Sequence, residues 1–479
     1  MSEENKVVAE QRELPKLKHP EPDVSPEEPW QDDVLDRAKI AEKLTSYIRD
    51  QRDPFVISID GKWGTGKTFL LKRWQKELED EGFRVIHFNA WEDDFCDDPL
   101  LSIIGQLSEH FKRGKLKTLA DEMGKIAVPL LKKNALLGLS RATGLTFEVD
   151  LNERDLLQEY RDQRQCKTEL KGHLAKMSAA TFAETGHPLV FIIDELDRCR
   201  PTFAIELLER VKHIFDVSDI VFVFGVNRDE FCSSLNSVYG DIEASVYLRR
   251  FFDMEFSLPE TNTDPFCRSL MRKYRLEECF RSLSESAKTA MHFQEYRHLS
   301  EGFPALCVRF GLSLRDIDYC VRLLALTARS LLDRQYMYPY LLGFLIPLKF
   351  KEPLLYRQFI SGERLASEVM NFVDEVNAGQ TIDPHLDDWL AVTEAYLYVA
   401  EGASSDLSGE STVLEHLRRL QQGEDMTDSK FLSERTKVQG KGRADRLLNM
   451  IESEIEIRHA RRMLNHLVGL IDFSRPSIM

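Results

Sequence analysis

The chain has 479 residues, 43% of them hydrophobic and 30% charged, which is the composition of an ordinary globular protein of roughly two to four domains. Its formal net charge of −16 argues against a general nucleic-acid coat protein, although a local basic groove stays compatible with it. The eight cysteines show no Cys-x-x-Cys or paired Cys/His spacing. We therefore expect reduced thiols in a cytoplasm, and neither a disulfide framework nor a zinc site.

The amino-terminal stretch, residues 1–30, is polar, acidic and proline-bearing, and it lacks the apolar core of a signal peptide. We expect a disordered or loosely docked tail there. From residue 30 to residue 50 the apolar side chains fall mostly on one face of a helix, which predicts that ordered structure begins with this segment.

A glycine-rich loop, GKWGTGKT, follows the apolar strand-like run Phe55–Ile59 and precedes a helical pattern. Glycines allow successive backbone N–H groups to point at phosphate, and the helix that follows adds its positive dipole end. Lys67 is expected to reach the β- and γ-phosphates, and the Thr68 hydroxyl to complete a Mg²⁺ shell. No guanine-specific Asn-Lys-x-Asp motif is present, so ATP is favoured. The predicted ATP-contacting residues are Gly61, Lys62, Trp63, Gly64, Thr65, Gly66, Lys67 and Thr68.

A second buried strand is predicted over residues 83–91, and a helix start at Asp98-Pro99. Residues 112–186 then form a helix-favouring insert within the predicted core, residues 31–260. Two apolar pieces at 126–131 and 135–139 are separated by lysines, so no uninterrupted run is long enough to span a bilayer. We expect a helical hairpin here; the alternative is contact with a membrane interface.

Two further hydrophobic runs end in polar residues. Residues 188–193 lead directly into Asp194 and Glu195, and residues 219–226 lead into Asn227. Asp194 is placed to bind Mg²⁺ at the strand tip, and Glu195 to polarise a water for attack on the γ-phosphate. Hydrophobic strands alternating with helices predict an α/β fold, in which helices flank a parallel sheet with its ligand at the carboxyl ends of the strands.

Four segments resemble the KAP family of P-loop NTPases: FNAWEDD (88–94), IIDELDRCRP (192–201), VFVFGVNRDEF (221–231) and YLRRFFDMEFSLP (247–259). The resemblance runs from about Asp33 to Leu324. Many family members carry transmembrane helices between the P-loop and the Asp194 strand. The corresponding insert in this chain is too polar to span a bilayer, which predicts a soluble protein or, at most, peripheral membrane contact.

The family is similar to AAA+ and STAND ATPases, and this similarity implies roles for individual positions. Asp194 and Glu195 match the Walker B pair, and Asn227 matches the sensor that feels the γ-phosphate. Arg250, favoured over Arg249, matches the arginine finger. Arg315 matches the second sensor on the lid helix. For the arginines, a solvated surface charge or a structural ion pair is the alternative. Asp197 and Arg198 look like a family hallmark without an assigned role.

Beyond residue 260 the sequence predicts helices only: a lid at 261–335 and a carboxyl-terminal region at 336–479. The apolar stretch 336–359 is expected to be a core helix broken at Pro347, with a membrane element as the alternative. A basic cluster, QGKGRADR at 439–446, and another at 458–462 are interpreted as solvated helix faces. The alternative is contact with nucleic acid.

Together these features predict a cytoplasmic ATP-binding and ATP-hydrolysing switch with Mg²⁺ as its cofactor. We expect the ATP state to self-associate and to act on an unknown protein effector. The resemblance suggests a prokaryotic phage-defence or signalling role, because the family includes a phage-exclusion protein. The alternative is a nucleotide-dependent scaffold that binds a protein partner or a membrane surface and hydrolyses ATP only incidentally.

Overall fold

The computed structural model describes residues 24–96, 98–127, 156–259, 262–287, 291–330, 338–376, 378–379, 381–402, 412–453, 464, 467–469 and 471–472. The chain divides into two compact units, and the boundary between them falls between Glu260 and Thr261. Three predicted segments lie outside the described residues: most of the tail (1–23), most of the apolar hairpin (128–139) and the basic cluster 458–462.

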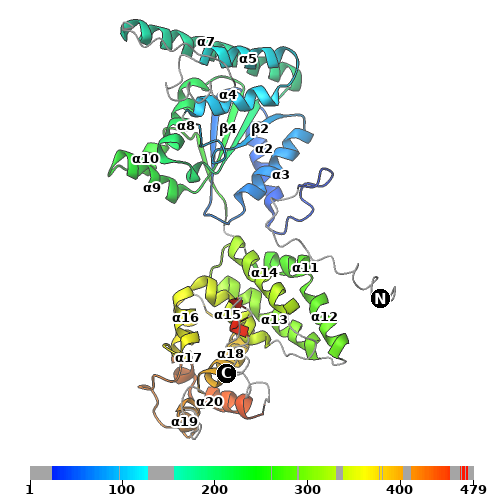
Figure 1. Ribbon diagram of the computed structural model, residues 1–479, viewed down its shortest axis with the longest axis vertical. Helices are drawn as coiled ribbons and strands as arrows, with labels where there is room; N and C mark the ends of the chain where they lie inside the picture. Colours follow the sequence, from blue (N-terminus) through cyan, green and yellow to red (C-terminus); the bar gives the residue numbers. More distant parts are fainter. Residues whose placement is uncertain are drawn as a thin grey trace. The chain divides into compact units, whose positions relative to one another are not determined.

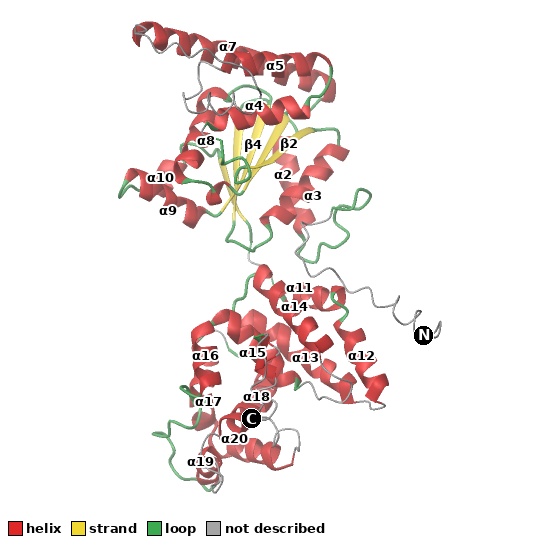
Figure 2. Cartoon of the chain, in the orientation of Figure 1, coloured by secondary structure: helices red, strands yellow, loops and turns green. Residues whose placement is uncertain are grey.

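The first unit is built on a sheet of five parallel strands in the order β2-β3-β4-β1-β5 (Figure 2). The strands are β1 (Phe55–Asp60), β2 (Arg84–Asn89), β3 (Leu189–Asp194), β4 (Ile220–Val226) and β5 (Met254–Ser257). In register, Asp60 lies opposite Val226 and Asn89 lies opposite Asp194. The predicted polar strand tips therefore meet at one edge, and the predicted parallel α/β fold is confirmed.

Helices cover both faces of this sheet, which explains why the three central strands are hydrophobic without alternation. On one face α2 (Arg37–Ile48) and α3 (Lys67–Asp80) share a core with the strands. On the other face α4 (Pro99–His110) and α8 (Pro201–Ile214) do so. The insert helices α5 (Gly114–Ala127) and α7 (Leu156–Thr185) add to the α4 side (Figure 1). A 3₁₀ turn, η2 (Leu196–Arg198), follows β3, while α9 (Arg228–Tyr239) and α10 (Ala244–Leu248) follow β4.

The second unit is helical throughout its described part, and one hydrophobic cluster joins its helices. The helices are α11 (Asp264–Lys273), α12 (Leu276–Ala287), α13 (Met291–Arg309), α14 (Leu314–Ser330), α15 (Pro339–Lys351), α16 (Pro353–Ser361), α17 (Ala366–Glu375), α18 (Pro384–Gly402), α19 (Thr412–Gln421) and α20 (Glu434–Ser453). The cluster spans the stretches predicted as lid and carboxyl-terminal region. Among the described residues, no helix combines the length and the apolar character needed to cross a membrane.

The predicted break at Pro347 is wrong. Helix α15 continues through Pro347 and stops only before Pro353. Nearly every side chain of α15 from Leu341 to Leu348 is buried. Packing on all sides of this helix offsets the hydrogen bond that an internal proline removes.

A buried polar network joins α18 to the start of α20. The Glu394 side chain is fully buried and accepts hydrogen bonds from the Ser433 hydroxyl (2.5 Å), the Thr436 hydroxyl (2.8 Å) and Arg443 Nη2 (2.8 Å). The Tyr398 hydroxyl donates to the same carboxylate at 2.8 Å.

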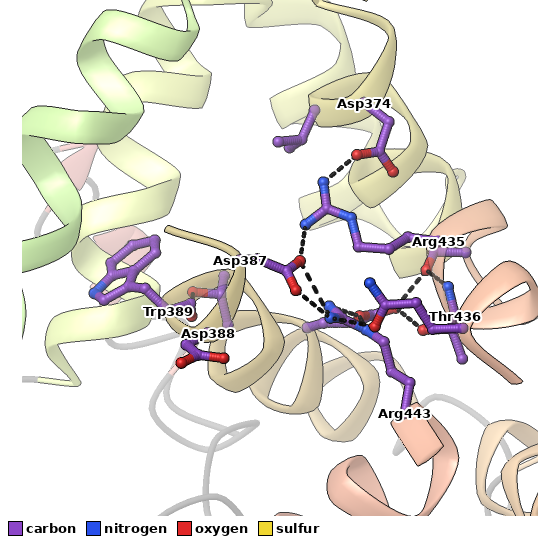
Figure 3. Close-up of polar contacts among 12 residues, drawn as sticks. Asp374, Asp387, Asp388, Trp389, Arg435, Thr436 and Arg443 are labelled. Carbon is purple, nitrogen blue, oxygen red and sulfur yellow. Dashed lines mark hydrogen bonds and ion pairs between the residues drawn. The ribbon is translucent and has the colours of Figure 1, made fainter. Parts of the chain in front are cut away.

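The network continues through Arg435, whose side chain is 8% exposed. Arg435 pairs with Asp374 and, at 2.9 Å, with Asp387, and Arg443 also contacts Asp387 (Figure 3). Arg443 belongs to the basic cluster at 439–446, so the interpretation of that cluster as a solvated helix face is wrong for this residue. Its charge is used inside the protein and is not presented to nucleic acid.

Candidate nucleotide-binding site

The glycine-rich loop lies between β1 and α3 at the carboxyl edge of the sheet. Gly64 and Gly66 have φ values of 80° and 90°, a left-handed conformation that glycine adopts at low cost. Gly61 N–H donates to the Val226 carbonyl at 3.1 Å, which fixes the start of the loop to the end of β4. Helix α3 begins at Lys67, so the N–H groups of the loop and the amino terminus of the helix lie together at the carboxyl edge of the sheet.

Lys67 is buried, with 8% of its surface exposed, and its amine donates to the Gly61 carbonyl and, at 3.3 Å, to the Lys62 carbonyl. Burial lowers the pKa of Lys67, while the nearby carboxylates of Asp197 and Asp194 act to raise it. A phosphate would replace two neutral carbonyls with anionic acceptors for this ammonium group, which is a stronger interaction.

Thr68 and Asp194 meet across 126 positions of sequence. The Thr68 hydroxyl donates to Asp194 Oδ2 at 2.7 Å, and Glu195 N–H donates to Asp194 Oδ1 at 2.8 Å. Asp194 is 3% exposed, and burial raises the pKa of its carboxyl group. A Cβ atom added at Gly225 of β4 would lie 2.6 Å from Asp194 Oδ1 and 2.7 Å from Leu71 Cδ1, so this strand position leaves the space that the carboxylate occupies.

Glu195 is held by residues on both sides of it. Its backbone is left-handed, with φ 60°, which is unusual for a residue with a long side chain. Asn89 Nδ2, at the end of β2, donates to Glu195 Oε2 at 3.0 Å. Arg198 Nη1 lies 3.0 Å from Glu195 Oε1. Asn89 was not among the predicted site residues, although it lies in the FNAWEDD segment that resembles the family. The predicted strand extended to residue 91, whereas β2 ends at Asn89, opposite Asp194.

Trp63 and Asp197 also connect the loop to the turn after β3. Trp63 Nε1 donates to Asp197 Oδ2 at 2.5 Å, although the two residues are separated by 134 positions. Arg37, at the start of α2, is buried and donates to the Thr65 carbonyl at 3.3 Å and to the Pro259 carbonyl at 3.4 Å. The loop is therefore supported by one side chain from the start of α2 and by another from the turn after β3.

Of the other predicted site residues, Asn227 lies next to the loop, whereas the arginines are exposed. Asn227 is buried at the amino end of α9, directly after Val226, whose carbonyl binds the first residue of the loop. Arg249 and Arg250 are exposed, and within the described part of the chain no hydrogen bond or ion pair joins their side chains to the loop. Arg315 is exposed in the first turn of α14 and belongs to the second unit. The roles of these residues stay predictions.

The chemistry of the site fits a nucleotide with a divalent cation. A hydroxyl and a carboxylate stand side by side, which is the donor pair that Mg²⁺ takes in P-loop proteins. Loop N–H groups, a helix amino terminus and a buried ammonium surround a place for phosphate. Asp197 Oδ1 is buried and has no hydrogen-bond partner among the described residues.

One of three comparisons with known proteins agrees with this geometry. A family model described as the KAP family P-loop domain matches residues 37–338. A search of curated proteins finds no match. Two solved structures align over most of both chains. The ORC2 protein of Aeropyrum pernix, in complexes with ADPNP and ADP, shares 13% identity at a TM-score of 0.32 and covers 93% of this chain and 97% of its own. AMPPCP-bound DnaA of Aquifex aeolicus shares 12% identity at 0.28 and covers 94% and 98%. At these scores neither likeness supports a conclusion about this chain.

Proposed function

Since this chain belongs to the KAP family of P-loop NTPases, we propose that it binds ATP with Mg²⁺, hydrolyses it, and uses its nucleotide state as a switch. The observation that carries the proposal is the 2.7 Å contact between the Thr68 hydroxyl and the Asp194 carboxylate at the foot of a glycine-rich loop. Two such oxygen groups, brought together from distant parts of the sequence beside a buried lysine, are what a nucleotide-bound metal ion requires.

The residues divide the work as follows. Loop N–H groups and Lys67 bind the phosphates, and Thr68 and Asp194 would hold Mg²⁺, which neutralises charge on the β- and γ-oxygens when bound. Glu195 accepts the proton of the attacking water, and Asn227 at the neighbouring strand tip contacts the γ-phosphate side. Arg250, which is exposed, acts on the nucleotide of a neighbouring subunit, and Arg315 responds to the nucleotide from the lid helix.

Binding and hydrolysis are tested together on the full chain. ATP binding is measured by titration calorimetry and turnover by phosphate release, with Lys67→Ala as the blank for both. We expect the wild type to bind and hydrolyse ATP only when Mg²⁺ is present, and Lys67→Ala to do neither. A wild type that binds no nucleotide, or that binds it equally well after Lys67→Ala, contradicts the proposal.

The assembly part of the proposal needs its own measurement. Light scattering with and without ATP reports self-association. Mixing Arg250→Ala subunits with Lys67→Ala subunits tests whether the arginine acts on a neighbour, because each variant supplies what the other lacks. Restored turnover in the mixture supports that role, and no rescue at any ratio supports a monomeric switch. Since the family includes a phage-exclusion protein, phage defence or signalling in a prokaryotic cytoplasm is where we propose to look for the effector.

One observation favours a second candidate, a long-lived ATP-bound scaffold. Both carboxylate oxygens of Glu195 are engaged, one by Asn89 and the other by Arg198. A general base held in this way is less free to approach a water. Partner or vesicle capture that needs ATP but is unchanged by Glu195→Gln would favour the scaffold, whereas capture that changes with hydrolysis would favour the switch.

A further inference from the structure

The short turn η2 presents two charged side chains in different directions. Asp197 contacts the phosphate-binding loop through Trp63, and Arg198 contacts the proposed base Glu195. Backbone bonds from Arg198 N–H to the Glu195 carbonyl (3.1 Å) and from Cys199 N–H to the Leu196 carbonyl (3.3 Å) close the turn on itself. A closed turn of three residues has few ways to move one side chain without moving the next.

The Asp197 carboxylate is unusual for a structural residue. It is 7% exposed, one oxygen accepts the Trp63 indole N–H at 2.5 Å, and the other has no hydrogen-bond partner among the described residues. Burying a carboxylate with an unused oxygen destabilises a fold. Trp63 in turn leaves 45% of its surface exposed, so the hydrogen bond and not burial of the ring fixes its position.

A phosphate in the loop would compete for the hydrogen bonds of Lys67 next to Trp63. The Lys67 ammonium group now donates to the carbonyls of Gly61 and Lys62, and an anionic oxygen is a stronger acceptor than either. Release of the more distant Lys62 carbonyl, at 3.3 Å, would free the peptide that joins Lys62 to Trp63. The indole is the one side chain of the loop with a hydrogen bond to η2 among the described residues.

We infer that Trp63 and Asp197 are positioning residues that couple occupancy of the phosphate-binding loop to the placement of Glu195, through η2 and Arg198. The inference rests on the proposed function, because it assigns a task in ATP hydrolysis. It also gives a physical role to the Asp-Arg pair that the sequence left unassigned.

The test replaces the indole N–H without removing the ring. In Trp63→Phe we expect the affinity for a fluorescent ATP analogue to stay within about threefold of the wild type, while kcat falls by about tenfold or more, because binding groups are intact and the base is misplaced. Trp30→Phe is the matched control: Trp30 Nε1 donates to Glu77 Oε2 at the same 2.5 Å in the same unit, near the far end of α3. It should leave both quantities unchanged.

A second readout does not depend on turnover. The emission of Trp63, taken as the difference between wild type and Trp63→Phe, should change when ATPγS and Mg²⁺ are added, and this change should be lost in Asp197→Ala. The change persisting in Asp197→Ala, or no change in the wild type, overturns the inference. The emission measurement also distinguishes a failure of this inference from a failure of the proposed function. A wild type that binds ATPγS but releases no phosphate from ATP contradicts only the proposed hydrolysis, because the emission change still tests the coupling.

The coupling also predicts non-additivity. Trp63→Phe and Arg198→Ala should together lower kcat by about as much as the larger single effect, because both act through one turn. Additive effects would mean that the two residues act separately and would overturn the inference. So would a Trp63→Phe protein whose affinity falls by more than about tenfold with kcat preserved, because Trp63 would then only support the loop.

Discussion

Two polar networks in this protein treat their carboxylates in opposite ways. Glu394, in the helical unit, is fully buried and receives hydrogen bonds from Ser433, Thr436, Tyr398 and Arg443. Asp197, in the nucleotide-binding unit, is nearly as buried, yet one of its oxygens has no hydrogen-bond partner among the described residues. Both groups lost contact with water on folding, but only the first recovered all of its hydrogen bonds.

The difference in hydrogen bonding distinguishes a carboxylate that stabilises the fold from one that can still bind a ligand. A saturated carboxylate fixes which helices pack together and has no capacity left for a ligand. Asp197 has an oxygen without a hydrogen bond among the described residues, and it lies near the buried Lys67 and near Glu195, whose backbone is left-handed. A cation or a hydrogen-bond donor that reached this oxygen would recover the free energy lost when the carboxylate was buried. Substitutions should therefore act on stability in the first network and on chemistry in the second.

The largest expected effect is on chemistry. Glu195→Gln keeps the size of the side chain and removes the base, so phosphate release should fall by about 10²–10⁴-fold while ATP binding is retained. Thermal unfolding without nucleotide should change little, because Gln can still accept from Asn89. Turnover at the wild-type rate would show that Glu195 is not the base, and it would contradict the expectation that substitutions in this network act on chemistry.

The next effect is on stability. Arg443→Ala leaves Glu394 buried without its cation, and we expect the free energy of unfolding to fall by about 3–5 kcal/mol in urea titrations. Arg446→Ala is the matched control on the same helix, because Arg446 forms an exposed pair with Asp388 at 2.6 Å. It should cost less than about 1 kcal/mol. Equal losses in the two variants would show that the buried network contributes no more than a surface pair.

A smaller loss should follow from removing one neutral donor. Tyr398→Phe deletes a hydroxyl that donates to Glu394 and accepts from Ser433 N–H at 3.0 Å. Leaving these two buried groups without it should cost about 1–3 kcal/mol in the same urea titrations. No measurable loss would mean that water enters the network, so that Glu394 is less enclosed than its burial indicates.

The smallest expected effect on the free energy of unfolding is that of Asp194→Asn, which should not cause the loss expected for Glu394→Gln. Burial raises the pKa of Asp194, so the folded state without ligand binds this proton more tightly than the unfolded chain does, and stability is lost as the pH rises through the raised pKa. At neutral pH, Asp194→Asn should leave the free energy of unfolding unchanged within about 0.5 kcal/mol or raise it. Glu394→Gln should lower it. Both are measured without nucleotide and Mg²⁺, and a clear loss in Asp194→Asn would contradict the contrast.

Much of the first unit could be predicted because its signals are local. A complete P-loop motif, hydrophobic runs and the polar residues at their ends indicated the parallel sheet and placed Thr68 and Asp194 at one edge. The contacts of Asn89 with Glu195 and of Trp63 with Asp197 could not be predicted, since each joins residues more than 100 positions apart through side-chain geometry. Two general rules also failed: a proline did not break the helix at Pro347, and the charge cluster at 439–446 did not leave Arg443 exposed, because tertiary packing decided both.

Gly225 carries a consequence for comparing members of the family. In the sequence it looks like a weak point inside a hydrophobic strand, yet any side chain there would collide with Asp194 and Leu71. A relative with an intact glycine-rich loop but a larger residue at this position should therefore have lost its cation site. A single residue outside both the glycine-rich loop and the Asp194–Glu195 pair would then distinguish family members that can bind the cation from those that keep only the glycine-rich loop.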